Sequence, residues 1–169
     1  DFKKIRELKK WCDDNGKGLY ALANSGCLNN CSAHTFHDNL VSHESEISAM
    51  DNGYSFEGIC KKYLENEDKL FNILNITSFI RPEDIELYEG LFTSMKLATR
   101  VNSNPIRIIE AYLERGRHAG SALDLLEPNH TGTIYPYYVD NSRIHKIVTE
   151  DGLKYTNDNN AIIKLKEDI

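Results

Sequence analysis

The residue types best suited to metal chemistry are gathered in one short stretch of this chain. Cys27 and Cys31 are separated by three residues, and His34 and His37 follow directly. Cys60 is the only cysteine further downstream. Thiolate sulfur and imidazole nitrogen are the ligands that iron, zinc and iron–sulfur clusters take from proteins. The spacing therefore indicates a metal centre, with these three cysteines and two histidines as its candidate ligands.

Other interpretations of the same residues stay open. Two thiolates and two imidazoles form a ligand set that zinc accepts, although the spacing does not match a standard zinc finger. A radical-SAM loop needs a third cysteine where this chain has His34, so the sequence disfavours that class. The cysteines can also be ordinary buried thiols. Cys12, which closes a helical pattern before the candidate site, is expected to be buried and inert.

A short apolar run precedes the cysteines, which indicates that they follow a β-strand. Residues 19–23 have the length of a strand and lead into Asn24-Ser-Gly-Cys27. Residues 33–49 and 56–64 have the apolar spacing of helices. The candidate ligands therefore lie in a strand-to-helix turn, and such turns form the functional end of a parallel α/β sheet.

Helical and strand-like patterns alternate along the chain, which predicts an α/β fold with a parallel sheet. Three strands are too few for a closed barrel, which typically needs about 250 residues. We therefore expect residues 1–127 to form a partial (β/α) TIM-barrel-like domain and residues 128–169 to form a C-terminal extension, either a hairpin or a loose tail. The predicted strands cover residues 19–23, 76–80 and 95–98, and further helices cover 2–13, a segment opening at Pro82, one from Pro105 to Gly116, and 121–126.

Several segments resemble the second half of the collagenase-like peptidase family (the U-thirty-two family). They are Phe79-Ile-Arg-Pro-Glu-Asp-Ile-Glu-Leu-Tyr-Glu89, Met95-Lys-Leu-Ala-Thr-Arg100 and Ile108-Ile-Glu-Ala-Tyr112. Upstream, Asn24-Ser-Gly-Cys-Leu-Asn-Asn-Cys-Ser-Ala-His-Thr-Phe-His-Asp-Asn39 is similar to a cysteine-containing strand–loop element of a divergent branch. The resemblance covers about residues 18–126 and implies a TIM-barrel-like fold.

The same resemblance implies a 4Fe–4S cluster, because several members of that family hold one on four cysteines. Relatives act in hydroxylation of ubiquinone or RNA, so it also implies modification of a small molecule or RNA. Only three cysteines lie in the matching region, and the fourth ligand is expected from His34, His37, a missing part of the chain or a substrate. A non-catalytic partial-barrel module and a zinc-binding peptidase-like protein are the alternatives, and the catalytic residues stay unknown.

Polar side chains near the strand ends are candidates for substrate binding. Arg81 and Arg100 close successive predicted strands, where an arginine can clamp a carboxylate or phosphate or can form an ion pair with neighbouring acids. Both are expected at the same end of the sheet as Cys27. Asn24 is expected to orient the cysteine loop through hydrogen bonds to the backbone. The remaining histidines lie in polar surroundings and are expected to be solvated: His118, His130 and His145.

Composition excludes several classes of protein. The 169-residue chain has a net charge of −6 and no basic cluster, which disfavours DNA binding. Its mean hydropathy is −0.51, and it has no run of the roughly 18 apolar residues that span a membrane. Without a secretory signal, we expect a cytoplasmic protein with free thiols. The chain starts at Asp1 within a helical pattern, so we expect a fragment that pairs with another copy or with the missing part of a longer chain.

Overall fold

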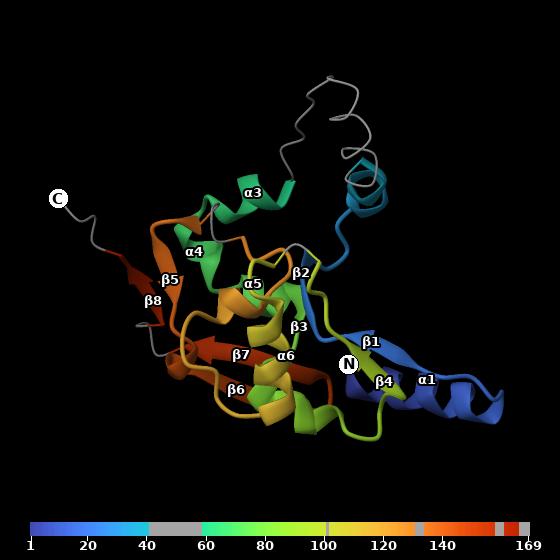
Figure 1. Ribbon diagram of the computed structural model, residues 1–169. Helices are drawn as coiled ribbons and strands as arrows, with labels where there is room; N and C mark the ends of the chain where they lie inside the picture. The colour runs from blue at the N-terminus through green and yellow to red at the C-terminus, as the bar shows by residue number, and fades with distance from the viewer. Residues whose placement is uncertain (41–58, 101, 131–133, 158–160, 166–169) are drawn as a thin grey trace.

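The computed structural model describes residues 1–40, 59–100, 102–130, 134–157 and 161–165 (Figure 1). Helices and strands are mixed, and the described strands pair into four two-stranded sheets that do not close into a barrel. No helix in the described part of the chain is long and apolar enough to cross a bilayer. The elements discussed below are α1 (Phe2–Asp14), β1 (Tyr20–Leu22), β2 (Asn24–Leu28), α3 (Ile59–Leu64), α4 (Glu67–Leu70), α5 (Ile73–Ile76), β3 (Thr77–Phe79), η1 (Pro82–Tyr88), β4 (Ser94–Lys96), α6 (Pro105–Glu114), η2 (Ala122–Leu125), β5 (Tyr137–Val139), η3 (Asn141–Arg143), β6 (Ile144–Thr149), β7 (Gly152–Asn157) and β8 (Ile162–Lys164).

The two longest helices form where their capping residues predict them. The Asp1 carboxylate accepts a hydrogen bond from the Lys4 N–H at 3.1 Å and caps α1. The Asn104 side chain caps α6 in the same way, with Pro105 in the first turn. Cys12 is buried at the end of α1, as expected. The segment opening at Pro82 is helical too, but it is the 3₁₀-helix η1.

The sheet topology differs from the prediction at the middle strand. β1 pairs with β4 in parallel, as expected of the first and third predicted strands. β3, however, pairs antiparallel with β2, so the prediction of three parallel strands is wrong. The reason is that the first strand bends at Ala23 and continues to Leu28. The Ala23 N–H donates to the Lys96 carbonyl at 3.0 Å, and the Ala23 carbonyl accepts from the Ile80 N–H at 2.8 Å.

The buried side chain of Asn24 holds this bend in place. Its Nδ2 donates to the carbonyls of Ala98 at 2.7 Å and Leu125 at 3.0 Å, and its Oδ1 accepts from the Ala98 N–H at 2.7 Å. The amide therefore joins β2 to the segment that follows β4 and to the last residue of η2. Because the side chain is fully buried, loss of these bonds would leave peptide groups unsatisfied.

Gly26 lets the chain after η2 approach β2 closely. A Cβ at this position would lie 2.0 Å from the Pro128 carbonyl oxygen, so no other residue fits without movement of the backbone. The Gly26 N–H donates to the Glu127 carbonyl at 2.9 Å. On the carbonyl side, Nε2 of the buried His130 ring lies 2.7 Å from the Gly26 oxygen. The ring nitrogen must donate in this bond because the partner is a carbonyl.

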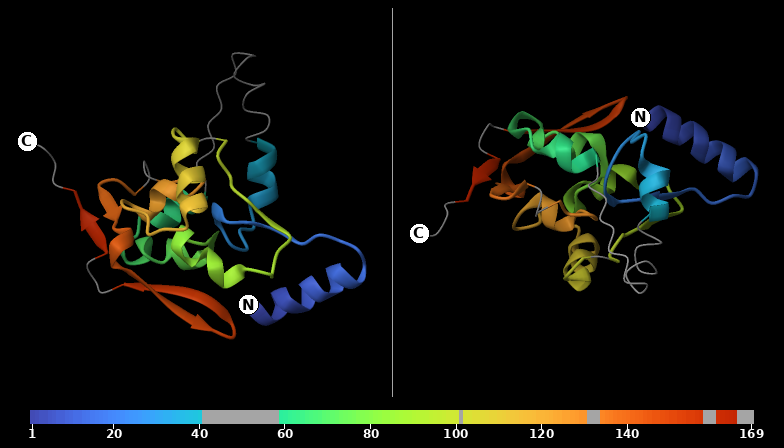
Figure 2. Two further views of the ribbon diagram at one scale, coloured as in Figure 1. Left: turned by 60° about the horizontal axis from the view of Figure 1, so that its bottom comes forward. Right: turned by 90° about the horizontal axis from the view of Figure 1, so that it is seen from above.

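The C-terminal strands pack against the same core as β3. β6 and β7 form a regular antiparallel hairpin. Tyr155 of β7 lies with its ring centroid 6.4 Å from that of Phe79, and both side chains belong to the buried cluster. Figure 2 shows α1 and the C-terminal strands β5 and β8 at opposite sides of the molecule, with β3 and α6 between them.

Arg81 connects this hairpin to η1. Its Nε lies 2.7 Å from Asp84 Oδ2, and the other Asp84 oxygen accepts from Lys146 Nζ at 2.7 Å. The guanidinium also donates to the Ile144 carbonyl at 3.2 Å and lies 4.9 Å from the centre of the Tyr155 ring. Arg81 and Asp84 are almost completely buried, so each charge depends on the other for its solvation.

Replacement of Arg81 tests this network. Arg81→Ala should lower the free energy of unfolding by about 3–5 kcal/mol, because it leaves the Asp84 carboxylate buried without its main partner. Arg100→Ala is the matched control, since Arg100 is exposed, and a change within about 0.5 kcal/mol is expected. Urea unfolding at pH 7 measures both variants. Equal stabilities of the two variants would contradict this account.

The buried histidine beside Gly26 should make stability depend on pH. Burial lowers the pKa of His130, an effect that the hydrogen bond to Gly26 partly opposes. The unfolded chain therefore binds a proton more readily, with a pKa of about 6.5. The free energy of unfolding should consequently fall as the pH drops from about 7 through 6. His130→Gln, which keeps an N–H donor but cannot titrate, should flatten this slope in urea unfolding. The exposed control His145→Gln should not.

Candidate functional site

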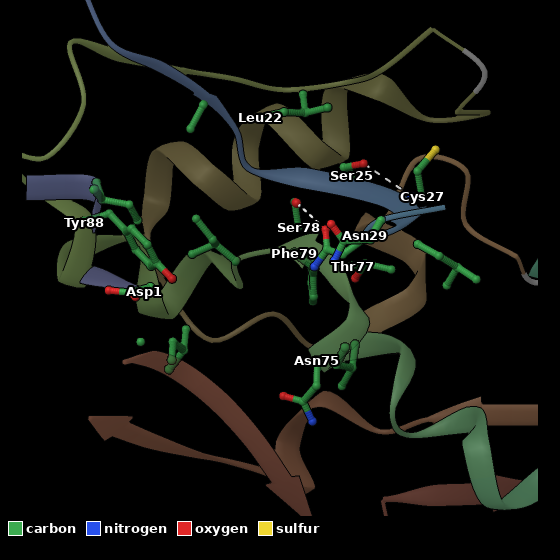
Figure 3. Close-up of a pocket in the computed structure, with 18 of the residues that line it drawn as sticks. Asp1, Leu22, Ser25, Cys27, Asn29, Asn75, Thr77, Ser78, Phe79 and Tyr88 are labelled. Carbon is green, nitrogen blue, oxygen red and sulfur yellow. Dashed lines mark hydrogen bonds between the residues drawn. The ribbon is translucent and has the colours of Figure 1, made fainter. Parts of the chain in front are cut away.

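A cavity of about 720 Å³ lies between β2, β3, the start of α1 and the turn joining β6 to β7. Figure 3 shows Cys27 at one side of this pocket and Tyr88 and Asp1 at the other, with Thr77, Ser78 and Asn29 between them. We call it the thiol pocket. Three of the predicted metal ligands line it: Cys27, Cys31 and His34.

Cys27 lies in β2, and the tight turn after this strand carries Cys31. The Cys31 N–H donates to the Leu28 carbonyl at 3.3 Å, and the His34 N–H donates to the Cys31 carbonyl at 3.2 Å. Asn30 adopts the left-handed conformation, with φ of 59°, which asparagine tolerates better than most residues. Residues 34–40 continue as a helix, so the beginning of the predicted helix over 33–49 is confirmed and its remainder lies outside the described residues.

The pKa of the Cys27 thiol is raised by burial and by negative charges, among them those of Asp38 and two other cysteines. Burial raises the pKa of the half-buried Cys27 thiol, and the negative charges of Asp38, Cys60 and Cys31 raise it further. A hydrogen bond with the Ser25 side chain opposes these effects. Two of these charges belong to the other predicted cysteine ligands, Cys31 and Cys60. Without a cation the Cys27 thiolate is disfavoured, and a bound metal ion would reverse that balance.

The described side chains do not form a coordination shell for a metal ion. No three His, Cys, Asp or Glu side chains in the described part of the chain are placed to hold one metal ion. All four cysteines are free thiols. His37 is half-buried on the same helical segment as His34 but does not line the thiol pocket. The structure therefore gathers Cys27, Cys31 and His34 at the pocket and brings Cys60 within electrostatic reach.

Asp38 is a functional candidate that the sequence reasoning missed. Its Oδ2 lies 3.5 Å from His34 Nε2, one helical turn away. It also exerts the largest charge effect on the Cys27 thiol. The spacing of four residues between His34 and Asp38 is the signal that could have found it, because residues i and i+4 are neighbours on a helix.

The rest of the pocket is polar and aromatic but not basic. Ser78 Oγ donates to Asn29 Oδ1 at 2.9 Å on the floor of the pocket. Tyr88 stacks at an angle on Phe2, with ring centroids 5.1 Å apart, and burial raises its phenol pKa. No lysine or arginine is among the described residues that line it. The lining therefore suits a small, polar, uncharged molecule better than a polyanion such as RNA.

The three predicted substrate-binding residues lie outside the lining of this pocket. Asn24 is buried at the bend, where it bonds to the backbone, and Arg81 is buried in the ion pairs that the sequence left as the alternative. Arg100 is exposed, and its N–H donates to Glu127 Oε1 at 2.8 Å. A role for any of them in substrate binding stays a prediction.

Two positional expectations are wrong. Arg81 does not emerge at the same end as Cys27, because β3 runs antiparallel to β2 and its end lies opposite Asn24, at the start of β2. His118 and His130 are not solvated, since each is only 8% exposed. Both lie where the chain folds back onto the core. Their polar neighbours in the sequence do not indicate this burial.

Comparison with known proteins adds one relationship. The chain is 34% identical over 130 residues to a protein of Methanocaldococcus jannaschii named as an uncharacterized protease. The match covers 73% of this chain but only 36% of the relative, so the chain spans about a third of that protein. No protein-family profile matches the chain. No solved structure matches it. This chain is thus similar to a part of a longer protein that is named as a protease.

Proposed function

We propose that this chain is the metal-binding part of a collagenase-like peptidase family protein, with a thiolate-bound centre at the mouth of the thiol pocket. Cys27, Cys31 and Cys60 would hold the centre, and His34 would be the fourth ligand. The observation that carries the proposal is that two free thiols, Cys27 and Cys31, line one pocket together with His34. Similarity to a protein named as a protease supports the family, although its name gives no metal.

The chemistry of these donors fits a 4Fe–4S cluster. Iron takes thiolates as ligands, and three thiols with one imidazole supply four donors of the right softness. Cys27 at the end of β2 and Cys31 in the following turn line the same pocket, so a centre bound there would draw on both sulfurs. A bound cation would also offset the burial and the negative charges that raise the pKa of Cys27. Such a cluster supplies electron transfer or a Lewis-acid iron.

The residues of the pocket define what this centre could act on. The Ser78 and Asn29 side chains offer hydrogen bonds next to the turn, and Tyr88 and Phe2 offer an aromatic wall. A small polar molecule held between them would contact the centre directly. We therefore favour modification of a small molecule over modification of RNA, because the described lining has no basic side chain.

Zinc is the second candidate, and the position of His34 favours it. His34 lines the pocket beside Cys27 and Cys31, which gives the mixed thiolate and imidazole set that zinc binds. In that case the protein would be a zinc-binding, peptidase-like protein. A metal-free protein would instead be a non-catalytic module that binds a partner chain, with the partial barrel completed by that partner.

Metal analysis of the purified chain tests the proposal. Protein prepared without oxygen should be brown, absorb near about 400 nm, and contain about four iron and four sulfide per chain. Cys27→Ala and Cys60→Ala should each lose most of the iron and the absorbance. Cys12→Ala is the matched control, because Cys12 is a buried thiol of α1 outside the pocket lining, and it should keep both.

Three other outcomes decide between the alternatives. Colourless protein with about one zinc per chain, lost in Cys27→Ala, would favour the zinc site. A folded protein without metal after reconstitution with iron and sulfide would contradict the proposal. Equal loss of iron in Cys12→Ala and Cys27→Ala would show that the variants act through folding, and it would also count against the proposed ligands.

A further inference from the structure

β4 has an open edge. The Lys96 carbonyl accepts from Ala23, and Ala98 bonds to the Asn24 side chain, so both residues face β1 and its continuation. Peptide groups alternate in direction along a strand. Those of Met95 and Leu97 therefore point away from β1. Among the described residues β4 pairs with β1 alone, so these N–H and C=O groups have no strand partner.

An apolar groove runs beside this open edge. It has a volume of about 390 Å³ and lies between β4, η1 and α6. Met95 and Leu97 form one wall, and Ile109 and Leu113 of α6 form part of the other. An ion pair between Glu89 and Arg115 marks its rim. A molecule that fills the groove would therefore meet apolar side chains and unpaired backbone groups together.

The outer surface of α6 extends the groove. Three large apolar residues, Ile106, Ile109 and Leu113, are 65%, 42% and 75% exposed. Their spacing of three and then four residues places them on one side of the helix. We call the open edge of β4, the groove and this stripe the β4–α6 face. Apolar surface of this extent next to an open strand edge is typical of a protein–protein interface.

We propose that a second copy of this chain covers the β4–α6 face, with the two β4 strands paired antiparallel across a twofold axis. The open edge requires an extended strand whose own edge is free, with apolar side chains at alternate positions. β4 itself has these properties, because Met95 and Leu97 alternate with the exposed Lys96. In a twofold arrangement the same contact satisfies the unpaired groups of both copies at once.

The α6 stripe supplies the apolar contact that a strand edge alone lacks. Stable interfaces bury about 800 Å² on each partner, which exceeds what one three-residue strand covers. Pairing of β4 with β4 brings the two α6 stripes to the same side of the contact. Leu113, the most exposed of the three, should lie nearest its centre.

The residues proposed for the interface differ from those proposed as metal ligands. The two cavities share Tyr88 and Phe92, but Cys27, Cys31 and His34 line only the thiol pocket. Met95, Leu97 and Leu113 line only the groove. Loss of metal should leave the dimer intact, and loss of the dimer should leave metal content unchanged.

Sedimentation equilibrium of the 169-residue chain between about 1 and 100 µM tests the proposal, and a dimer is expected. Leu113→Asp should raise the dimer dissociation constant by at least about tenfold, because it places a charge in the apolar contact. Met95→Pro should do the same by removing an N–H from the open edge only. Trp11→Asp on α1 is the matched control, since Trp11 is 56% exposed on another element, and it should not change the constant.

Circular dichroism of each variant confirms that it is folded before the comparison is made. A wild-type chain that stays monomeric at 100 µM would overturn the proposal and indicate that another polypeptide covers this face. A dimer that withstands both Leu113→Asp and Met95→Pro, or one that Trp11→Asp weakens equally, would also overturn it.

Discussion

The bend between β1 and β2 is the constraint on which the rest of the structure depends. Ala23 bonds to β4 on one side and to Ile80 on the other, and the buried Asn24 amide ties both to the end of η2. Gly26 then leaves room for the Pro128 carbonyl. These contacts fix the direction in which β2 leaves the β1–β4 pair. They consequently decide that Cys27 and the turn after it face the cavity between β3 and α1.

The charges around Cys27 are the reason for proposing a metal centre at this turn. Elsewhere in the described structure, the buried Arg81 and Asp84 pair with each other, and the exposed Lys146 also bonds to Asp84. Around Cys27 the described neighbours are instead other thiols and an aspartate, whose charges all oppose ionisation of the thiol. Such a group of like-charged ligands is stable as neutral thiols or with a cation bound between them. The same residues would thus be inert without metal and strong ligands with it.

Local sequence signals predicted the elements better than their pairing. Asp1 and Asn104 cap α1 and α6 as their residue types suggest, and the strands at Ala21, Ser78 and Met95 exist. The antiparallel pairing of β3 was missed because Asn24-Ser-Gly-Cys27 reads as a loop. In the structure this segment pairs with β3 and also contacts the 125–128 segment. Cys27 and Cys31 line one pocket together with His34, whereas a shared centre with Cys60 stays a prediction. Burial of Arg81, by contrast, depends on a hairpin more than 60 residues away, which no local pattern encodes.

X-ray absorption at the edge of the bound metal is the most direct test of the central claim, that Cys27, Cys31 and Cys60 share one metal centre. This account predicts a first shell dominated by sulfur at about 2.3 Å, with fewer sulfur neighbours in Cys60→Ala than in the wild-type chain. A first shell made only of nitrogen and oxygen, or one that Cys60→Ala leaves unchanged, would contradict it.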